Sequence, residues 1–160
     1  MLLRSKRSSD LGRQVVTALQ RWNGIQSLML VQKLIEKRAD VNQDHAQTGA
    51  FSLLLAAESG HEGCVEVLLD SGADANQVNA QDGGFPLLLA AEAGHAGCVE
   101  ALLNKGADAK QVNAQSGFSP LRLAMQLGHE GCVLMLKESA RARGRAHGCL
   151  LYTSPSPRDA

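Results

Sequence analysis

The fold is decided by GHAGCVEALLNKGADAKQVNAQ, the stretch from Gly94 to Gln115. A near copy, GHEGCVEVLLDSGADANQVNAQ, spans Gly60 to Gln81, and 17 of the 22 positions are identical. The offset between the copies is about 34 residues, and self-similarity at a fixed period of about 20–50 residues indicates stacked structural repeats. A third, decaying copy, GHEGCVLMLKESA, begins one further period along the chain, at Gly128. The sequence therefore predicts a repeat architecture.

Each repeat contains two short segments whose apolar residues recur at helical spacing. In the second repeat, the first segment places Leu53 and Ala56 on one face, and the second places Val65 and Leu68 on one face. Gly72 follows at a position where helices commonly end in the left-handed conformation. The predicted fold class is therefore all-α, with a helix–turn–helix unit of about 34 residues as the repeat.

Counting in steps of one repeat divides the chain into three parts. Residues 1–10 are small, polar and basic, and we predict that they are disordered. The repeat domain then covers residues 11–142, as repeats at about 11–45, 46–79, 80–113 and 114–142. In the last repeat Lys137 replaces a leucine of the Leu-Leu pair, which indicates a C-terminal cap because terminal repeats need a polar outer face. Residues 143–160 are predicted to form a disordered tail.

These motifs resemble the ankyrin repeat. The pattern is carried by Gly83 to Ala91, Gly94-His95, Val99, Leu102-Leu103 and Gly106-Ala107-Asp108. The resemblance implies a curved solenoid of about four antiparallel helix pairs with finger-like turns. It also implies a non-enzymatic interaction module that binds a protein partner through the finger tips and the concave face of the first helices. The alternative is a regulatory or targeting fragment of a larger multidomain enzyme or channel.

The chain departs from the ankyrin pattern in its repeat length and at its helix-capping position. The repeat unit exceeds the family's usual length of about 33 residues, and the extra residue lengthens the finger. At the position of the family's helix-capping threonine, only Ser119 has a hydroxyl, and Phe51 and Phe85 stand there in the two preceding repeats. Losing a cap costs about 1 kcal/mol, so we expect those two helices to depend on packing of the phenylalanines.

The resemblance places the recognition residues in the turns and at the two positions after each Ala-Ala pair. The predicted partner-binding residues are Gln47, Thr48, Ala50, Glu58, Ser59, Gln81, Asp82, Gly84, Glu92, Ala93, Gln115, Ser116, Phe118, Gln126 and Leu127. Among them, Phe118 and Leu127 are apolar where solvent is expected, and a paired apolar patch often marks an interface. We expect these two, with Gln126 beside them, to contact the partner first.

Charge is distributed unevenly along the chain, although the formal net charge is zero. Between Asp40 and Lys110 there are 11 acidic residues against two lysines. An acidic middle argues against nucleic acid as the main ligand, because that affinity rests on clustered cations. It favours a protein partner with a basic surface. The basic ends, which include Arg141 and Arg143, are interpreted as solvated tails.

Histidine and cysteine recur three residues apart, at His61/Cys64, His95/Cys98 and His129/Cys132. That spacing is tolerable for metal ligands, but repeats stack about 10 Å apart, which is too far for two pairs to share one zinc ion. The same distance excludes disulfides. We therefore expect no metal, cofactor or catalytic residues, and no enzyme activity. Separate thiols favour an intracellular setting, cytoplasmic or nuclear.

Two further expectations concern the whole chain. No run of 18 apolar residues exists, so we expect no membrane association, and we expect a monomer. Cys149 to Asp159, CLLYTSPSPRD, resembles the translation of a sequencing-library adapter and matches no part of the repeat. The tail is therefore interpreted as artefactual from residue 149, and the native chain is expected to differ beyond Gly148.

Overall fold

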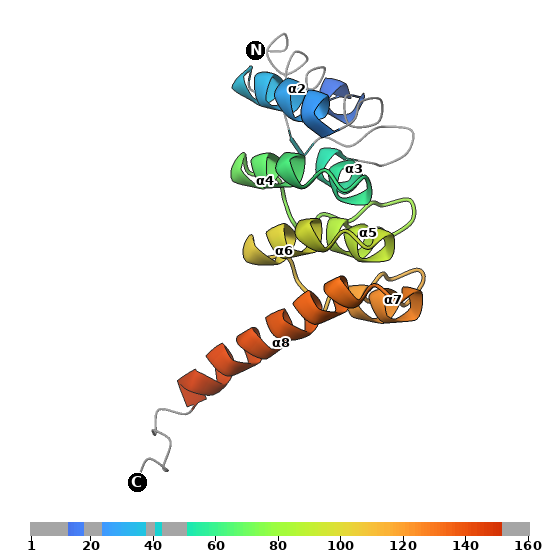
Figure 1. The fold of residues 1–160 in the computed structure, drawn as a ribbon, viewed down its shortest axis with the longest axis vertical. Coiled ribbons are helices and arrows are strands. Elements are labelled where there is room, and N and C mark those ends of the chain that lie inside the picture. The colour runs from blue at the N-terminus through green and yellow to red at the C-terminus, as the bar shows by residue number, and fades with distance from the viewer. Residues whose placement is uncertain (1–12, 18–23, 38–40, 43–50, 152–160) are drawn as a thin grey trace.

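The computed structural model describes residues 13–17, 24–37, 41–42 and 51–151. Its elements are helices: α2 (Gly24–Glu36), α3 (Ser52–Glu58), α4 (Glu62–Asp70), α5 (Pro86–Ala93), α6 (Ala96–Asn104), α7 (Pro120–Leu127) and α8 (Glu130–Leu151). Short turns join α3 to α4, α5 to α6 and α7 to α8, so the two helices of each pair run in opposite directions (Figure 1). The prediction of an all-α repeat fold is confirmed.

The helix pairs stack into a solenoid with two layers (Figure 1). The first helices form one layer, in which α5 packs between α3 and α7. The second helices form the other layer, in which α2, α4, α6 and α8 follow one another. Because each pair covers the apolar face of the pair before it, one continuous core runs through the stack.

Two phenylalanines and a series of small residues fill this core. Phe51 and Phe85 are each 1% exposed, and the Ala-Ala pairs of α3 and α5 are fully buried. Small side chains at the contacts allow the first helices to approach closely, while each phenylalanine fills the space at the start of a helix. The few aromatic rings of the chain are therefore sufficient to fill the core, since they lie buried at the starts of the first helices.

The first helices begin as the sequence predicts. The backbone N–H of Arg122 donates to Ser119 Oγ at 3.3 Å, which caps α7. At Phe51 and Phe85 no side chain caps the helix. Pro86 occupies the first turn of α5, where its missing N–H costs nothing. The capping prediction is confirmed, and α3 and α5 are held at their start by the buried rings.

The second helices end in two different ways. Gly72 has φ of +94°, so it takes the left-handed conformation predicted for it. The last repeat lacks this glycine, and α8 continues to Leu151 instead of ending at about Arg141. Alanine, arginine and leucine favour the helix over this stretch, against a cost of about 1 kcal/mol for each of Gly144 and Gly148. Helix therefore replaces the predicted disordered tail over residues 143–151, and residues 152–160 lie outside the described part of the chain.

The N-terminal end of the stack belongs to a divergent repeat. Helix α2 packs on α4 as α4 packs on α6, so it takes the place of a second helix. Residues 13–17 are helical, and Val15 joins the core. Residues 1–12 lie outside the described residues. Over the part of the chain that the structure describes, no helix has the length and apolar character needed to cross a membrane.

Candidate partner-binding surface

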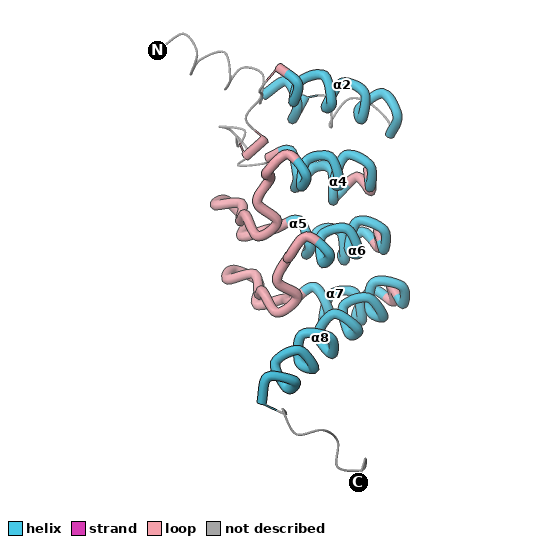
Figure 2. The backbone as a smooth tube through the Cα atoms, turned by 90° about the vertical axis from the view of Figure 1, so that its left-hand side faces the viewer, coloured by secondary structure: helices cyan, strands magenta, loops and turns pink. Residues whose placement is uncertain are grey.

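Two complete fingers project from the same side of the stack, between α4 and α5 and between α6 and α7 (Figure 2). Each finger is closed by backbone hydrogen bonds. The N–H of Asn79 donates to the carbonyl of Gly84 at 2.7 Å, and the N–H of Asn113 donates to that of Phe118 at 2.9 Å. The asparagine side chain also accepts from the backbone two residues on. The fingers therefore have a defined shape rather than an open loop.

Asparagine side chains fasten each repeat to the next. Asn76 Oδ1 accepts from the N–H of Asp108 at 2.7 Å, and Asn76 Nδ2 donates to the carbonyl of Gly106 at 3.4 Å. One repeat earlier, Asn42 Oδ1 accepts from the N–H of Asp74 at 2.9 Å. The bonds recur because Asn42 and Asn76 are separated by one repeat period. The sequence reasoning missed this ladder, although asparagine at the repeat period is the signal for it.

A second set of bonds joins the fingers near their tips. Asn113 Nδ2 donates to the carbonyl of Asp82 at 3.0 Å, and Gln115 Nε2 donates to the carbonyl of Gln81 at 3.1 Å. These bonds tie neighbouring fingers into a row. Little ordering entropy is left to lose when such a row binds a partner.

The two aspartates of the Gly-Ala-Asp motifs each bond to the backbone two residues further along the chain. Asp74 Oδ1 accepts from the N–H of Asn76, and Asp108 Oδ1 accepts from that of Lys110, each at 2.9 Å. Each aspartate therefore holds the base of a finger. Their carboxylates serve the scaffold in this way.

Most predicted partner-binding residues are exposed. They are Glu58, Ser59, Gln81, Asp82, Glu92, Ala93, Gln115, Ser116, Gln126 and Leu127. Gln47, Thr48 and Ala50 lie outside the described residues. The exposed positions fall into two rows, one along the fingers and one along the C-terminal ends of α3, α5 and α7. The structure thus brings ten of the predicted residues to the surface in a repeated arrangement.

Two predicted positions need correction. Gly84 is buried, and its N–H donates to Asp82 Oδ1 at 2.8 Å, so it offers a partner no surface. Phe118 is half-buried against the core, with the Arg122 guanidinium 5.1 Å from the ring centroid. Phe118 precedes α7 and Leu127 ends it, so about 12 Å of helix separates them. They do not form the single apolar patch that the sequence suggested.

Two exposed apolar residues lie in the fingers and were not predicted. Val78 is 47% exposed and Val112 is 51% exposed. One repeat period separates them, so they occupy equivalent positions in neighbouring fingers. Their recurrence at the repeat period, within otherwise polar fingers, is the signal that could have found them.

The acidic character predicted for the middle of the chain lies on the surface. From residue 51 to residue 110 every Asp and Glu is exposed, and the only Lys or Arg residues there are Lys105 and Lys110. Lys105 forms an ion pair with Asp70. Glu58 and Glu92 stand at equivalent ends of α3 and α5. Their carboxylates give the first-helix side of the stack a negative charge.

Histidines connect the start of each second helix to the first helix of the preceding repeat. His95 Nε2 lies 3.1 Å from the carbonyl oxygen of Glu58, and His129 Nε2 lies 2.9 Å from that of Glu92. Since a carbonyl only accepts, each Nε2 carries the proton. These hydrogen bonds hold successive repeats together.

The core cysteines are chemically quiet. Cys64, Cys98 and Cys132 are each 1% exposed and form no disulfide. Burial raises the pKa of the Cys64 thiol to about 11 and that of Cys98 to about 12. These thiols are therefore protonated at neutral pH. Only the thiolate acts as a nucleophile or a metal ligand. Among the described residues, no three His, Cys, Asp or Glu side chains are grouped to hold a metal ion.

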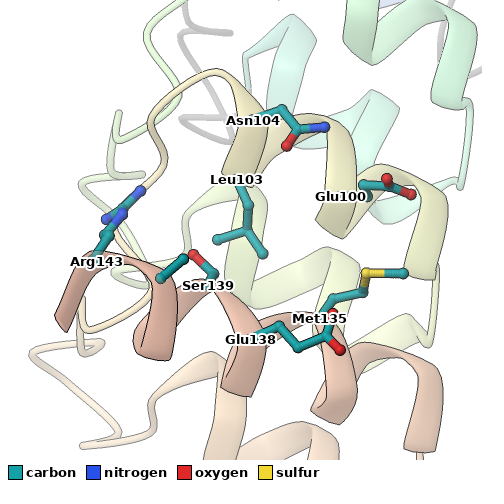
Figure 3. Close-up of a pocket in the computed structure, with 8 residues that line it drawn as sticks. Glu100, Leu103, Asn104, Met135, Glu138, Ser139 and Arg143 are labelled. Atoms are coloured by element: carbon teal, nitrogen blue, oxygen red, sulfur yellow. The ribbon is translucent and has the colours of Figure 1, made fainter. Parts of the chain in front are cut away.

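A groove of about 470 Å³ opens in the layer of second helices, between α6 and α8 (Figure 3). It forms because α8 tilts away from α6 as it runs toward Leu151 (Figure 1). Leu103 and Met135 lie between the two helices, and Arg143 closes one end (Figure 3). Arg143 Nη2 donates to the carbonyl of Ala107 at 2.6 Å, and Nη1 lies 3.8 Å from Asp108 Oδ1. Arg143 is thus an anchor for α8, which corrects its interpretation as part of a solvated tail.

Comparison with known proteins agrees with this geometry. A family model described as ankyrin repeats, in three copies, matches residues 53–144. A search of curated proteins finds no match to the chain. Ankyrin repeats are generally protein–protein interaction modules and are typically non-catalytic. The family match covers more than half of the sequence and coincides with the helix pairs from α3 to α8. The chain therefore belongs to the ankyrin repeat family.

Proposed function

We propose that this chain binds a protein partner through one continuous surface, which we name the binding face. It consists of the exposed residues of the fingers (residues 74–84 and 108–118) and of the C-terminal ends of the first helices (residues 58–59, 92–93 and 126–127). The observation that carries the proposal is the hydrogen-bonded row of fingers, which presents exposed side chains at one repeated spacing. Such pre-organisation favours affinity without any movement of the scaffold.

The chemistry of the binding face favours a partner that carries Lys or Arg. Glu58, Glu92 and Asp82 are exposed on it, and an acidic surface steers a basic one toward it. The same charges repel a phosphate backbone, so nucleic acid is not the proposed ligand. Val78, Val112 and Leu127 supply apolar area against which the aliphatic stems of such side chains can pack.

The proposed location is intracellular. Three core cysteines remain unpaired, and free thiols are typical of reducing compartments. No step of the proposed function uses a metal, a cofactor or a catalytic group. Binding is the whole of the proposed activity.

The test is a comparative capture with two matched double variants. Glu58→Lys/Glu92→Lys reverses charge on the binding face, and Glu66→Lys/Glu100→Lys reverses the same amount of charge on α4 and α6, where both residues are also exposed. Immobilised wild type and both variants are incubated with lysate, and retained proteins are identified by mass spectrometry. We expect a partner that is retained by wild type and by the α4/α6 variant and lost from the binding-face variant. Equal retention by all three proteins would refute the assignment of the face.

A further inference from the structure

The C-terminal end of the stack carries an exposed groove of about 520 Å³ between α7 and α8. Met125 and Leu134, two of its lining residues, are 57% and 55% exposed. The residues that line it include Met125 of α7, Gly128 of the turn that follows α7, and Glu130, Val133, Leu134 and Lys137 of α8. We name this surface the end face.

The end face is the surface that interior repeats use for stacking. A Cβ placed on Gly94 would lie 2.8 Å from the ring of His129 in the next repeat, whereas nothing lies within 4 Å of the same position on Gly128. Ala91 is fully buried by the next repeat, and Met125, which stands at the equivalent position one repeat later, is exposed. The last repeat thus ends in an uncovered packing surface.

Two substitutions enlarge the apolar centre of the end face, whereas Glu130 and Lys137 at its rim stand where α6 has Ala96 and Leu103. Met125 stands where α5 has Ala91, and Leu134 stands where α6 has the exposed Glu100. A terminal repeat that faces only water needs polar residues across its whole outer face, and the centre of the end face has apolar ones instead. An exposed apolar surface with a polar rim marks an interaction site. The side chains therefore indicate that the end face is covered in the functional protein.

The two charges of the end face are placed symmetrically about its apolar centre. Glu130 and Lys137 are seven residues apart, which is about two turns, so they project from the same side of α8. Val133 and Leu134 lie between them. If two α8 helices cross in opposite directions about a twofold axis between Val133 and Leu134, each Glu130 meets Lys137 of the other copy. The end face is therefore complementary to a second copy of itself.

We propose that the end face binds a second copy of this chain and forms a symmetric dimer through antiparallel α8 helices. A twofold interface uses the same patch on both subunits, so it requires self-complementary chemistry. Glu130 and Lys137 supply that chemistry at the rim, while Met125, Val133 and Leu134 supply the apolar centre. This assignment replaces the monomer expected from the sequence.

Charge reversal tests the proposal with the full chain. Native mass spectrometry and sedimentation equilibrium should give wild type twice the chain mass of 17.0 kDa. Glu130→Lys alone and Lys137→Glu alone should weaken dimerisation at least tenfold, because each places like charges opposite one another twice. An equimolar mixture of these two variants should recover the dimer as a heterodimer, since every pair is then of opposite charge.

Two more variants separate an interface effect from a folding effect. Leu134→Glu restores the residue type that α4 and α6 carry exposed at this position, so it should keep the helical circular dichroism spectrum and yield a monomer. Glu138→Lys changes charge beside Lys137 but on the side that faces α6, and it should remain dimeric. A monomeric wild type, or a mixture of Glu130→Lys and Lys137→Glu that stays monomeric, would overturn the proposal.

Discussion

Asn76 accepts a hydrogen bond from the backbone N–H of Asp108, one repeat further along the chain, at 2.7 Å. The bond links the finger base of one repeat to the Gly-Ala-Asp turn of the next. At the equivalent position in the last finger stands Lys110, and the Gly-Ala-Asp motif after it is replaced by Ala140-Arg141-Ala142. The asparagine ladder therefore stops where the turn sequence that it binds stops, and Arg143 secures the end of the stack instead.

Replacing Asn76 by alanine should destabilise the stack. The variant loses the bonds to Asp108 and Gly106 and leaves the Asp108 N–H without that acceptor, so we expect a loss of about 1–3 kcal/mol in the free energy of unfolding. Urea titration followed by circular dichroism measures it. The matched control is Asn104→Ala at the exposed end of α6, which should change the free energy of unfolding by less than about 0.5 kcal/mol. Equal effects of the two substitutions would disprove the role of the ladder.

The starts of α5 and α7 should differ in their sensitivity to substitution. Ser119→Ala removes one capping bond and should cost about 1 kcal/mol. Phe85→Ala empties a space in the core and should cost about 3–5 kcal/mol. Thermal and urea unfolding of both variants give the comparison. Similar losses at the two positions would show that packing does not replace the missing cap in α5.

The buried thiols predict a fall in stability at alkaline pH. Burial raises the pKa of Cys98 to about 12, above that of an exposed thiol at about 8.5. Between these values the unfolded chain loses its thiol proton and the folded chain retains it, so the free energy of unfolding decreases as pH rises above about 8.5. Urea titrations from pH 7 to pH 10 measure this decrease. Cys98→Ala should make the decrease shallower; an unchanged slope would contradict the assignment.

Arg143 should hold the second half of α8 in place. Arg143→Ala removes the bond to the Ala107 carbonyl and the contact with Asp108, so amide hydrogen exchange should accelerate between residues 140 and 151. Hydrogen-exchange mass spectrometry resolves the region. Arg141→Ala, at an exposed position, provides the control and should leave the exchange rates unchanged. Acceleration by both variants to the same extent would argue for a general loss of helix propensity.

The features that the sequence predicted correctly depend on local residues. The helix start at Ser119 and the left-handed Gly72 at a helix end each involve groups within a few positions of one another. The helical period and the repeat period could therefore both be read along the chain. The family resemblance added how the helix pairs stack.

The features that could not be predicted depend on neighbouring repeats. Gly84 and Phe118 occupy the same position in successive repeats. Gly84 is buried, and Phe118 is half-buried because its ring packs between the core and Arg122. Helix α8 continues to Leu151 because the last repeat lacks the Gly-Ala-Asp motif that ends the other second helices. The absence of that motif does not determine where the helix ends. Recurrence at the repeat period marks Val78 and Val112 as equivalent, but their exposure follows from the shape of the finger.

The central claim is that the binding face recognises a basic partner protein. The most direct measurement is the Kd of the captured partner for wild type, Glu58→Lys/Glu92→Lys and Glu66→Lys/Glu100→Lys, by isothermal titration calorimetry at two salt concentrations. We predict that binding-face reversal raises Kd at least tenfold, that α4/α6 reversal changes it less than threefold, and that salt weakens wild-type binding. Equal Kd values for the two double variants would contradict the account.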